Sequence, residues 1–246
     1  MLKNIRGEDS LQQKRNSVEF KVYGRYALFS DPITRPISEK FSYQVPTYQA
    51  IKGILESIYW KPTFIWYIDA IRVVKRVQTE SKGIRPINMK GGNDLSFYTY
   101  LKDVEYQVLA HFEWNEQRPN LAHDRDEHKH HNMARRSIKQ GGRRDVFLGT
   151  RECYAYVEPC SFGEGEGFYD RYGSLDFGIM FHGFDYPDET GRNELVVRLW
   201  NQKMTDGVII FEDPRNIELK RTAKEYGDKY HFKQFEEEVN FKVELV

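Results

Sequence analysis

The chain has 246 residues, and 37 Lys+Arg balance 37 Asp+Glu, so its overall charge gives no reason to expect a nucleic acid as partner. This length supports one large domain or two small ones with an ordinary core. Cys153 and Cys160 lack the spacing of a zinc site, and no apolar run approaches the roughly 18 residues that span a membrane. We therefore expect a cytoplasmic protein with reduced thiols and no membrane segment.

Hydrophobic periodicity divides the first 158 residues into strands and helices. Thr47 is the predicted N-cap of the first helix, which Pro62 ends because proline disfavours a helical residue before it. Apolar and polar residues alternate most clearly at 104–114, which predicts a half-buried strand. The expected segments are a polar tail at 1–17, a strand from 18, a loop at 30–46, a helix between Thr47 and Pro62, a strand at 63–77, a loop or small hairpin at 81–94, a strand at 104–114, a helix at 127–140 and a strand at 147–157.

The second helix carries start and stop signals. Asp124 and Glu127 have the spacing of a capping box with Asp124 as N-cap, and Gly141 and Gly142 supply the C-terminal stop. The order strand, helix, strand, strand, helix, strand is the split βαβ pattern of a ferredoxin-like (RRM-like) domain, which we place at 18–158.

Helical periodicity ends after about residue 158. The rest of the chain, 159–246, is therefore predicted to be a small antiparallel β domain, and the fold class is α+β. Its expected strands are 177–184, 195–200, 208–211 and 239–245.

Four of the seven histidines fall within nine residues, and a basic run follows them at 135–144. These histidines are His123, His128, His130 and His131. Imidazole is the side chain whose unperturbed pKa lies closest to neutrality. A solvated, His-rich helix start is the simplest interpretation. A metal site would use His128 and His131, but the spacing of known zinc or facial-triad motifs is absent.

Acid/base chemistry on a phosphate is the third interpretation of this window. RNA carries its own nucleophile, the 2′-hydroxyl. Its cleavage needs proton transfer and a cation for the extra charge on phosphorus, which adjacent His and Lys residues can supply without a metal. The basic run at 135–144 fits either a solvent-exposed face or contacts to phosphates.

Two further segments have simpler interpretations. The glycine-rich run 162–170 is expected to form a turn, because Glu164 and Glu166 would repel a phosphate. Tyr59 lies one position off the apolar stripe of the first helix and looks like a boundary residue with a hydrated hydroxyl. The RNP1 pattern of RNA-recognition motifs is missing, so base stacking on RNP1 aromatics is not expected.

Longer blocks of sequence resemble one known family over roughly residues 18–211. They resemble the CRISPR-associated endoribonuclease of type I-C systems, the d subtype (Dvulg type) of the fifth Cas family in the RAMP superfamily. The blocks are V-P-T-Y-Q-A at 45–50, E-S-I-Y-W-K-P at 56–62, E-S-K-G at 80–83, R-P at 85–86, Y-T-Y-L-K-D-V at 98–104, G-G-R-R-D-V-F-L-G at 141–149, R-E-C at 151–153, G-F-Y-D at 167–170, H-G-F at 182–184 and Y-P-D-E at 186–189.

The resemblance implies a ferredoxin-like domain followed by a small β domain. It also implies cofactor-free, metal-independent cleavage of precursor CRISPR RNA at the 3′ base of the repeat hairpin, which leaves a 2′,3′-cyclic phosphate and a 5′-hydroxyl. The enzyme is expected to keep the mature crRNA and to join the type I-C surveillance complex with its backbone and large subunits.

The family's catalytic tyrosine corresponds to Tyr59, and its D-R-x-E-x-K-H pattern places the catalytic pair at Lys129 and His130. A phenol with a pKa near ~10 is a poor base at neutral pH, so we expect Tyr59 to orient the 2′-hydroxyl or the phosphate. His130 is then the acid or base, and Lys129 stabilises the charge on phosphorus. The candidate RNA contacts are Arg125, Arg135, Arg136, Arg143 and Arg144.

Two alternatives remain open from the sequence. The chain fits a non-catalytic RNA-holding subunit of the same complex, in which the histidines form only a binding patch. It also fits, more weakly, a metal-dependent DNA nuclease that uses His128 and His131.

Overall fold

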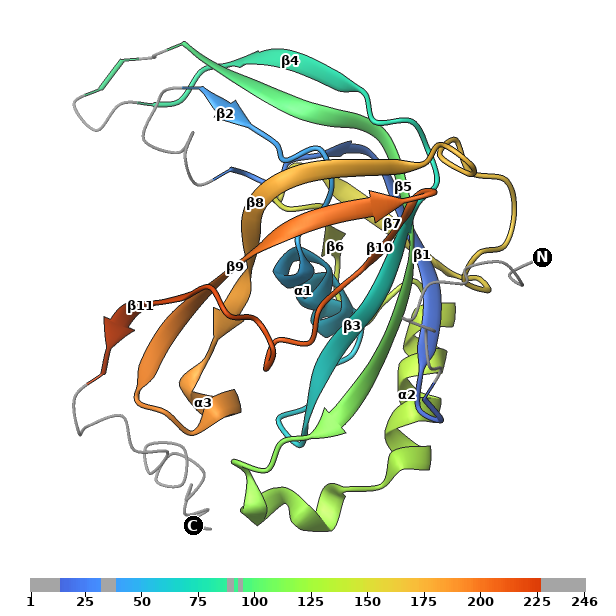
Figure 1. The fold of residues 1–246 in the computed structure, drawn as a ribbon, viewed down its shortest axis with the longest axis vertical. Helices are drawn as coiled ribbons and strands as arrows, with labels where there is room; N and C mark the ends of the chain where they lie inside the picture. The colour runs from blue at the N-terminus through green and yellow to red at the C-terminus, as the bar shows by residue number, and fades with distance from the viewer. Residues whose placement is uncertain (1–13, 32–38, 88–90, 93–94, 227–246) are drawn as a thin grey trace, which may run out of the picture.

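The computed structural model describes residues 14–31, 39–87, 91–92 and 95–226. Strands predominate, as the high aromatic content (15%) leads one to expect (Figure 1). The elements are β1 (Val18–Ala27), β2 (Lys40–Phe41), α1 (Tyr48–Ile58), β3 (Phe64–Val73), β4 (Thr79–Ile84), β5 (Ser96–Trp114), the 3₁₀-helix η1 (Pro119–Asp124), α2 (Glu127–Lys139), β6 (Val146–Phe147), β7 (Tyr154–Pro159), β8 (Ser174–Asp185), α3 (Pro187–Thr190), β9 (Glu194–Thr205), β10 (Val208–Ile210) and β11 (Lys220–Glu225).

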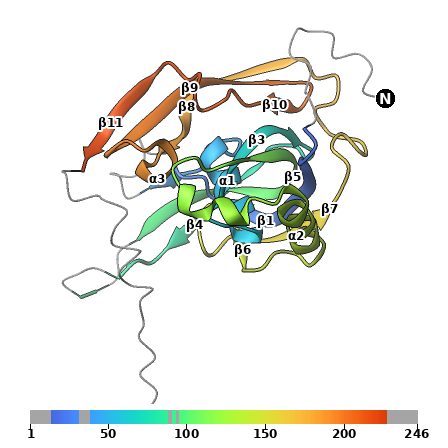
Figure 2. The same cartoon turned by 90° about the horizontal axis from the view of Figure 1, so that it is seen from below.

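The described strands form one 11-stranded, largely antiparallel sheet. Its main path runs β11-β9-β10-β3-β5-β1-β7-β6, while β2 and β4 pair with β5, and β8 pairs with β9. Among the strand pairs of the described residues, only the short pairing of β2 with β5 is parallel. The two views together place β9 and β11 on the opposite side of the molecule from α2 (Figures 1 and 2). The expected mixed, sheet-rich fold is confirmed.

The first helix forms where the sequence predicts it. The Thr47 hydroxyl accepts a hydrogen bond from the Ala50 N–H (3.2 Å), so it caps the helix as expected. The chain leaves the helix at Tyr59, which is already extended, before Pro62 is reached. The apolar stripe is buried in the core, as predicted; its members are Tyr48, Ile51, Ile54, Leu55 and Ile58.

The second helix is also confirmed, but its predicted capping box is wrong. The cap is Asp126, whose carboxylate accepts from the Lys129 N–H (3.0 Å). Asp124 instead ends the preceding 3₁₀-helix, which leaves its carboxylate free for other partners, and Glu127 becomes the first helical residue. At the other end Gly141 and Gly142 adopt positive φ and stop the helix as predicted.

The predicted strand at 147–157 is two strands, β6 and β7, separated by a turn. Gly149 in this turn has φ +93°, and a Cβ there would lie 2.0 Å from the Leu28 carbonyl oxygen. The turn packs backbone to backbone against the end of β1, where the Leu28 N–H donates to the Leu148 carbonyl (2.9 Å). A contact this close requires glycine, so tertiary packing overrides the strand pattern.

The strands β3 and β5 differ from their predicted boundaries. β3 ends at Val73 rather than at residue 77, and β5 already begins at Ser96. For the segment 81–94, expected to be a loop or a small hairpin, the hairpin is observed, because β4 pairs antiparallel with the first part of β5. Three short elements were not expected: β2 inside the loop at 30–46, the 3₁₀-helix η1 and the one-turn helix α3.

The C-terminal strands β8, β9 and β10 confirm three predicted strands, while the fourth, at 239–245, lies outside the described residues. Strand β11 was missed because its sequence, K-R-T-A-K-E, lacks apolar alternation. The glycine-rich run forms the predicted turn, and the carbonyls of Glu164 and Gly165 accept from Arg72. Among the described residues, no helix has the length and apolarity needed to cross a membrane.

Because the Thr47 cap fixes the start of the helix that ends at Tyr59, its loss should lower stability. We expect Thr47→Ala to reduce the free energy of unfolding by about 1 kcal/mol in urea denaturation. Thr47→Ser keeps a capping hydroxyl and serves as the control, with a change of only a few tenths of a kcal/mol. Equal losses for both variants would show that the hydroxyl is not the stabilising group.

Candidate active site

Tyr59 is held by backbone contacts at the point where the chain leaves α1. Its N–H donates to the Leu55 carbonyl (2.9 Å), and its carbonyl accepts from the indole N–H of Trp66 (2.8 Å). The ring packs beside Phe64 with 5.8 Å between centroids, and only 1% of the residue is exposed. The sequence places Tyr59 correctly at the helix boundary, but the expected hydrated hydroxyl is wrong.

The hydroxyl of Tyr59 lies 2.8 Å from Nδ1 of His130, which is fully buried. The other ring nitrogen, Nε2, lies 2.8 Å from the backbone carbonyl oxygen of Asp124. A carbonyl only accepts, so Nε2 must carry a proton. In the neutral ring Nδ1 is therefore the acceptor, and the phenol of Tyr59 donates to it. The structure thus brings together two of the three predicted catalytic residues.

Asp124 joins the third predicted residue to this pair. Its carboxylate accepts from the ammonium of Lys129 and from the hydroxyl of Thr63 (2.8 Å), and it lies 3.3 Å from Nε2 of His130. The hydrogen bond from Lys129 is the main reason that the pKa of Asp124 falls to about 2. Asp124 is thus a carboxylate at neutral pH, placed to balance a positive charge on His130.

The environment of Tyr59 raises the pKa of its phenol. Burial is the main cause, and the Asp124 carboxylate adds to it, while the Arg143 guanidinium opposes both. The phenol is therefore protonated at neutral pH and acts as a hydrogen-bond donor. This finding supports the expectation that Tyr59 does not act as a base by ionising.

A pocket of about 390 Å³ opens beside the end of α1, and Tyr59, Arg143 and Arg144 are among the residues that line it. The Arg143 guanidinium lies 6.0 Å from the centre of the Tyr59 ring. Glu56 also lines the pocket, and burial raises the pKa of its carboxyl to about 7, although Lys52 opposes the shift. Two of the five predicted RNA-contacting arginines therefore lie at the Tyr59 pocket.

The other three arginines lie elsewhere. Arg135 and Arg136 are exposed on α2. Arg125 is engaged within the protein, since its guanidinium donates to the Glu116 carboxylate (3.0 Å) and to the Asn115 carbonyl (3.0 Å). Arg125 therefore ties η1 to the end of β5 in this conformation.

The remaining histidines of the cluster have separate partners. His123 lies 3.1 Å from the Asn120 carbonyl, His128 accepts from Arg15 (3.1 Å), and His131 lies 2.9 Å from the Ser17 carbonyl. Within the part of the chain that the structure describes, no group of three or more His, Cys, Asp or Glu side chains is placed to hold a metal ion.

Two residues of this network were missed as participants by sequence reasoning. Asp124 was assigned to a helix cap, although its place in the D-R-x-E-x-K-H pattern was a usable signal. Thr63 carries no signal in the sequence, because its contact with Asp124 spans 61 residues and exists only in the folded chain.

The chain is similar to known CRISPR-associated proteins. Residues 17–212 match the model of the family Cas_Cas5d, described as CRISPR-associated protein (Cas_Cas5). A protein of Thermus thermophilus named CRISPR pre-crRNA endoribonuclease Cas5d is 31% identical over 191 residues, which cover 74% of this chain and 79% of that protein. One of Mannheimia succiniciproducens with the same name is 29% identical over 202 residues, covering 70% and 86%.

A solved structure of a CRISPR-associated protein is 37% identical and superposes with a TM-score of 0.72, covering 84% of this chain and 96% of that one. The match at 17–212 includes Tyr59, Lys129 and His130 and accounts for most of the chain. The chain therefore belongs to the Cas5d family of CRISPR-associated proteins.

Proposed function

We propose that this protein is an endoribonuclease that cleaves precursor CRISPR RNA at the 3′ base of the repeat hairpin, leaving a 2′,3′-cyclic phosphate and a 5′-hydroxyl. Membership of the Cas5d family and two relatives named pre-crRNA endoribonuclease support this activity. The observation that carries it is the buried hydrogen bond between Tyr59 and His130, with Asp124 and Lys129 attached to it.

The proposal extends to the architecture and the partners. The order β3-β5-β1-β7, with α1 after β1 and α2 after β5, supports a ferredoxin-like unit at 18–158. Residues 159–246 would form the second, β-rich part, which joins the sheet through the pairing of β10 with β3. The cytoplasmic location, the retained crRNA and the contacts with the backbone and large subunits of the type I-C complex belong to the same proposal.

In this mechanism the 2′-oxygen of the RNA attacks the adjacent phosphorus. As this bond forms, the bond between phosphorus and the 5′-oxygen breaks, and the leaving 5′-oxygen takes a proton from solvent water to become the 5′-hydroxyl. His130 has no exposed surface, and its Nδ1 faces the Tyr59 hydroxyl, so the proton travels through that hydroxyl. The 2′-hydroxyl gives its proton to the Tyr59 oxygen while Tyr59 gives its own proton to Nδ1. The imidazolium that forms is balanced by the Asp124 carboxylate, 3.3 Å from Nε2.

Lys129 supplies the positive charge for the phosphate. Its side chain is about half exposed (47%), so its ammonium is within reach of solvent while it contacts Asp124. A bound phosphate would compete with Asp124 for this ammonium, and the charge that develops on phosphorus in the transition state strengthens that interaction. No metal ion is needed for these steps.

The burial of the pair leads to a second candidate function. With exposures of 1% and 0%, Tyr59 and His130 do not contact a phosphodiester in the described conformation. Neighbouring side chains must therefore move when RNA binds. If they do not move, the protein is an RNA-holding subunit in which the pair has a structural role. The experiments below distinguish the two functions.

The first test is cleavage of a repeat hairpin in the presence of EDTA. We expect full cleavage, because the nucleophile and the proton carriers belong to RNA and protein. A single 2′-deoxy nucleotide 5′ to the cut should abolish cleavage, because it removes the nucleophile. Cutting of the deoxy substrate, or a requirement for Mg²⁺, would refute the mechanism.

Single-turnover rates of variants test the roles of the three residues. Tyr59→Phe keeps the packed ring and loses only the hydroxyl, and His130→Ala removes the acceptor; both should slow cleavage by roughly 10²–10⁴-fold. Lys129→Ala should also be slow. His123→Ala alters an exposed histidine of the same cluster and should cleave like the parent.

RNA affinity, measured by fluorescence anisotropy, should be retained in these variants. If the parent binds the hairpin and all three variants turn over at the parental rate, the pair is structural and the second candidate function is correct. Circular dichroism checks that His130→Ala, which empties a buried position, is folded.

The depressed pKa of Asp124 predicts a pH dependence of stability. The group titrates at about 2 in the folded protein and at 3.8 as its ordinary value, so its contribution is complete above pH 3.8 and is lost as the pH falls to about 2. Asp124→Asn should therefore be less stable than the parent by about 1 kcal/mol at pH 6, after allowance for solvent screening, and the difference should vanish as the pH falls below the folded pKa of about 2. Urea denaturation across this range measures both curves; a constant difference would contradict the assignment.

A further inference from the structure

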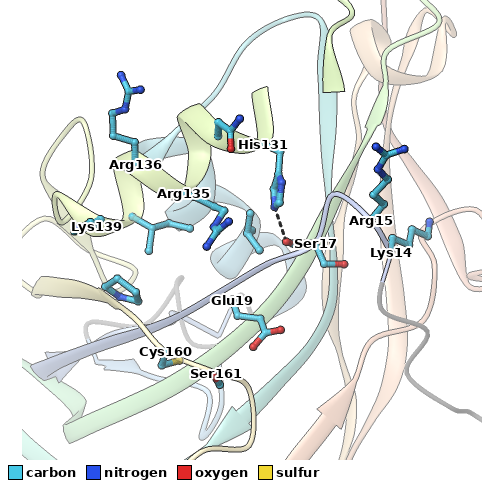
Figure 3. Close-up of a pocket in the computed structure, with 14 residues that line it drawn as sticks. Lys14, Arg15, Ser17, Glu19, His131, Arg135, Arg136, Lys139, Cys160 and Ser161 are labelled. Atoms are coloured by element: carbon cyan, nitrogen blue, oxygen red, sulfur yellow. Dashed lines mark hydrogen bonds between the residues drawn. The ribbon is translucent and has the colours of Figure 1, made fainter. Parts of the chain in front are cut away.

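A second, larger hollow lies on the side of α2 that faces the start of β1 (Figure 3). Its volume is about 760 Å³. One wall consists of α2 residues, the opposite wall is the segment 14–19, and residues 159–161 close the end. No Phe, Tyr or Trp lines this groove, and most of the side chains that do are polar or charged. It is separate from the pocket beside Tyr59.

Positive charge dominates the groove. Its cationic residues are Lys14, Arg15, Arg135, Arg136 and Lys139. Arg135 extends from α2 toward the opposite wall, whereas the side chain of Arg136 points away from it (Figure 3). Within the described part of the chain, the guanidinium groups of Arg135 and Arg136 and the ammonium of Lys139 have no acidic partner. The one acid, Glu19, accepts from the Phe162 N–H (2.6 Å).

The N-terminal wall is fastened to the body of the protein. Nε2 of His131 donates to the Ser17 carbonyl (2.9 Å), because that oxygen only accepts (Figure 3). The amide of Asn16 donates to the Phe112 carbonyl (2.6 Å), and Lys14 donates to the carboxylate of Glu113 (2.8 Å). Residues 14–17, expected to be part of a solvated tail, thus lie against the ends of β5 and α2.

We infer that this groove holds the sugar-phosphate backbone of the RNA on one side of the scissile phosphate, and that the N-terminal segment of this chain completes it. The inference rests on the proposed function for the identity of the polyanion. Clustered cations without aromatic neighbours are suited to phosphates rather than to bases, so the contacts are independent of sequence.

The position of the groove along α2 supports the same inference. It begins at His131, the residue directly after His130, and continues to Lys139. At a rise of 1.5 Å per residue this face of α2 is ~12 Å long. The RNA backbone could therefore continue along α2, away from the first turn that carries Lys129 and His130. Lys14 and Arg15 in the opposite wall precede residue 17, where the match to the family begins, whereas Ser17 to Glu19 lie within the match.

The test compares two double variants of the full chain. Arg15→Ala/Lys139→Ala removes one cation from each wall, and Lys203→Ala/Arg221→Ala removes two exposed cations from β9 and β11, away from α2. The probe is a repeat hairpin with flanking RNA that carries a 2′-deoxy nucleotide at the cut. Its dissociation constant is measured by anisotropy over a series of salt concentrations.

We expect the groove variant to bind roughly tenfold more weakly at physiological salt, and the slope of log K against log salt to fall by about 1.4, or ~0.7 for each lost phosphate contact. The control variant should match the parent. The cleavage rate of the unmodified hairpin at saturating enzyme should not change, because neither residue belongs to the Tyr59 network.

A His131 variant tests whether the hydrogen bond to the Ser17 carbonyl holds the N-terminal segment in place. His131→Ala should speed trypsin cleavage after Lys14 and Arg15, followed by mass spectrometry, and should weaken RNA binding as the groove variant does. Unchanged cleavage at these two bonds would overturn the role given to His131 as a clamp.

The groove inference is overturned if the groove variant matches the control in affinity and salt slope, or if its saturated cleavage rate falls together with affinity. A parent that binds the probe but never cuts the unmodified hairpin refutes the proposed function alone. A parent that does not bind the RNA refutes both.

Discussion

The hydrogen bond between the Tyr59 hydroxyl and Nδ1 of His130 is the interaction on which the candidate site depends. It joins the end of α1 to the first turn of α2, across 71 residues of sequence. Its direction is fixed from the far side of the ring, where the Asp124 carbonyl requires a proton on Nε2. The Tyr59 phenol remains protonated at neutral pH and so is a poor base by itself. Nδ1 of His130 is positioned to accept its proton.

The surroundings of this hydrogen bond set the protonation states of Tyr59 and Asp124. Burial raises the pKa of the Tyr59 phenol and keeps it a donor, while Lys129 holds the pKa of Asp124 low and keeps it an anion. One carboxylate therefore contacts both Lys129 and His130. In our proposal this arrangement lets Lys129 and His130 act at one place, because the Asp124 carboxylate lies between them.

Positive charge surrounds this centre on two separate surfaces. Arg143 and Arg144 line the pocket beside Tyr59, whereas Arg135, Arg136 and Lys139 line the groove between α2 and the N-terminal segment. Although the chain has no net charge, its cations gather on these two surfaces, where they can contact the phosphates of an RNA. In our proposal the two faces of α2 have different roles. The buried face carries the proton acceptor His130, and the exposed face binds the RNA.

The sequence by itself determined the two helices, the main strands and the family, because these follow from local periodicity, capping residues and long ordered blocks. Tertiary structure decided what depends on contacts between distant residues. Asp124 became a partner of Lys129 and Thr63 instead of a cap, Gly149 broke a predicted strand where it meets Leu28, and residues 14–17 became a wall instead of a tail. Local sequence reports which conformation a segment favours, but the partner of a buried polar group is set by the chain that folds over it.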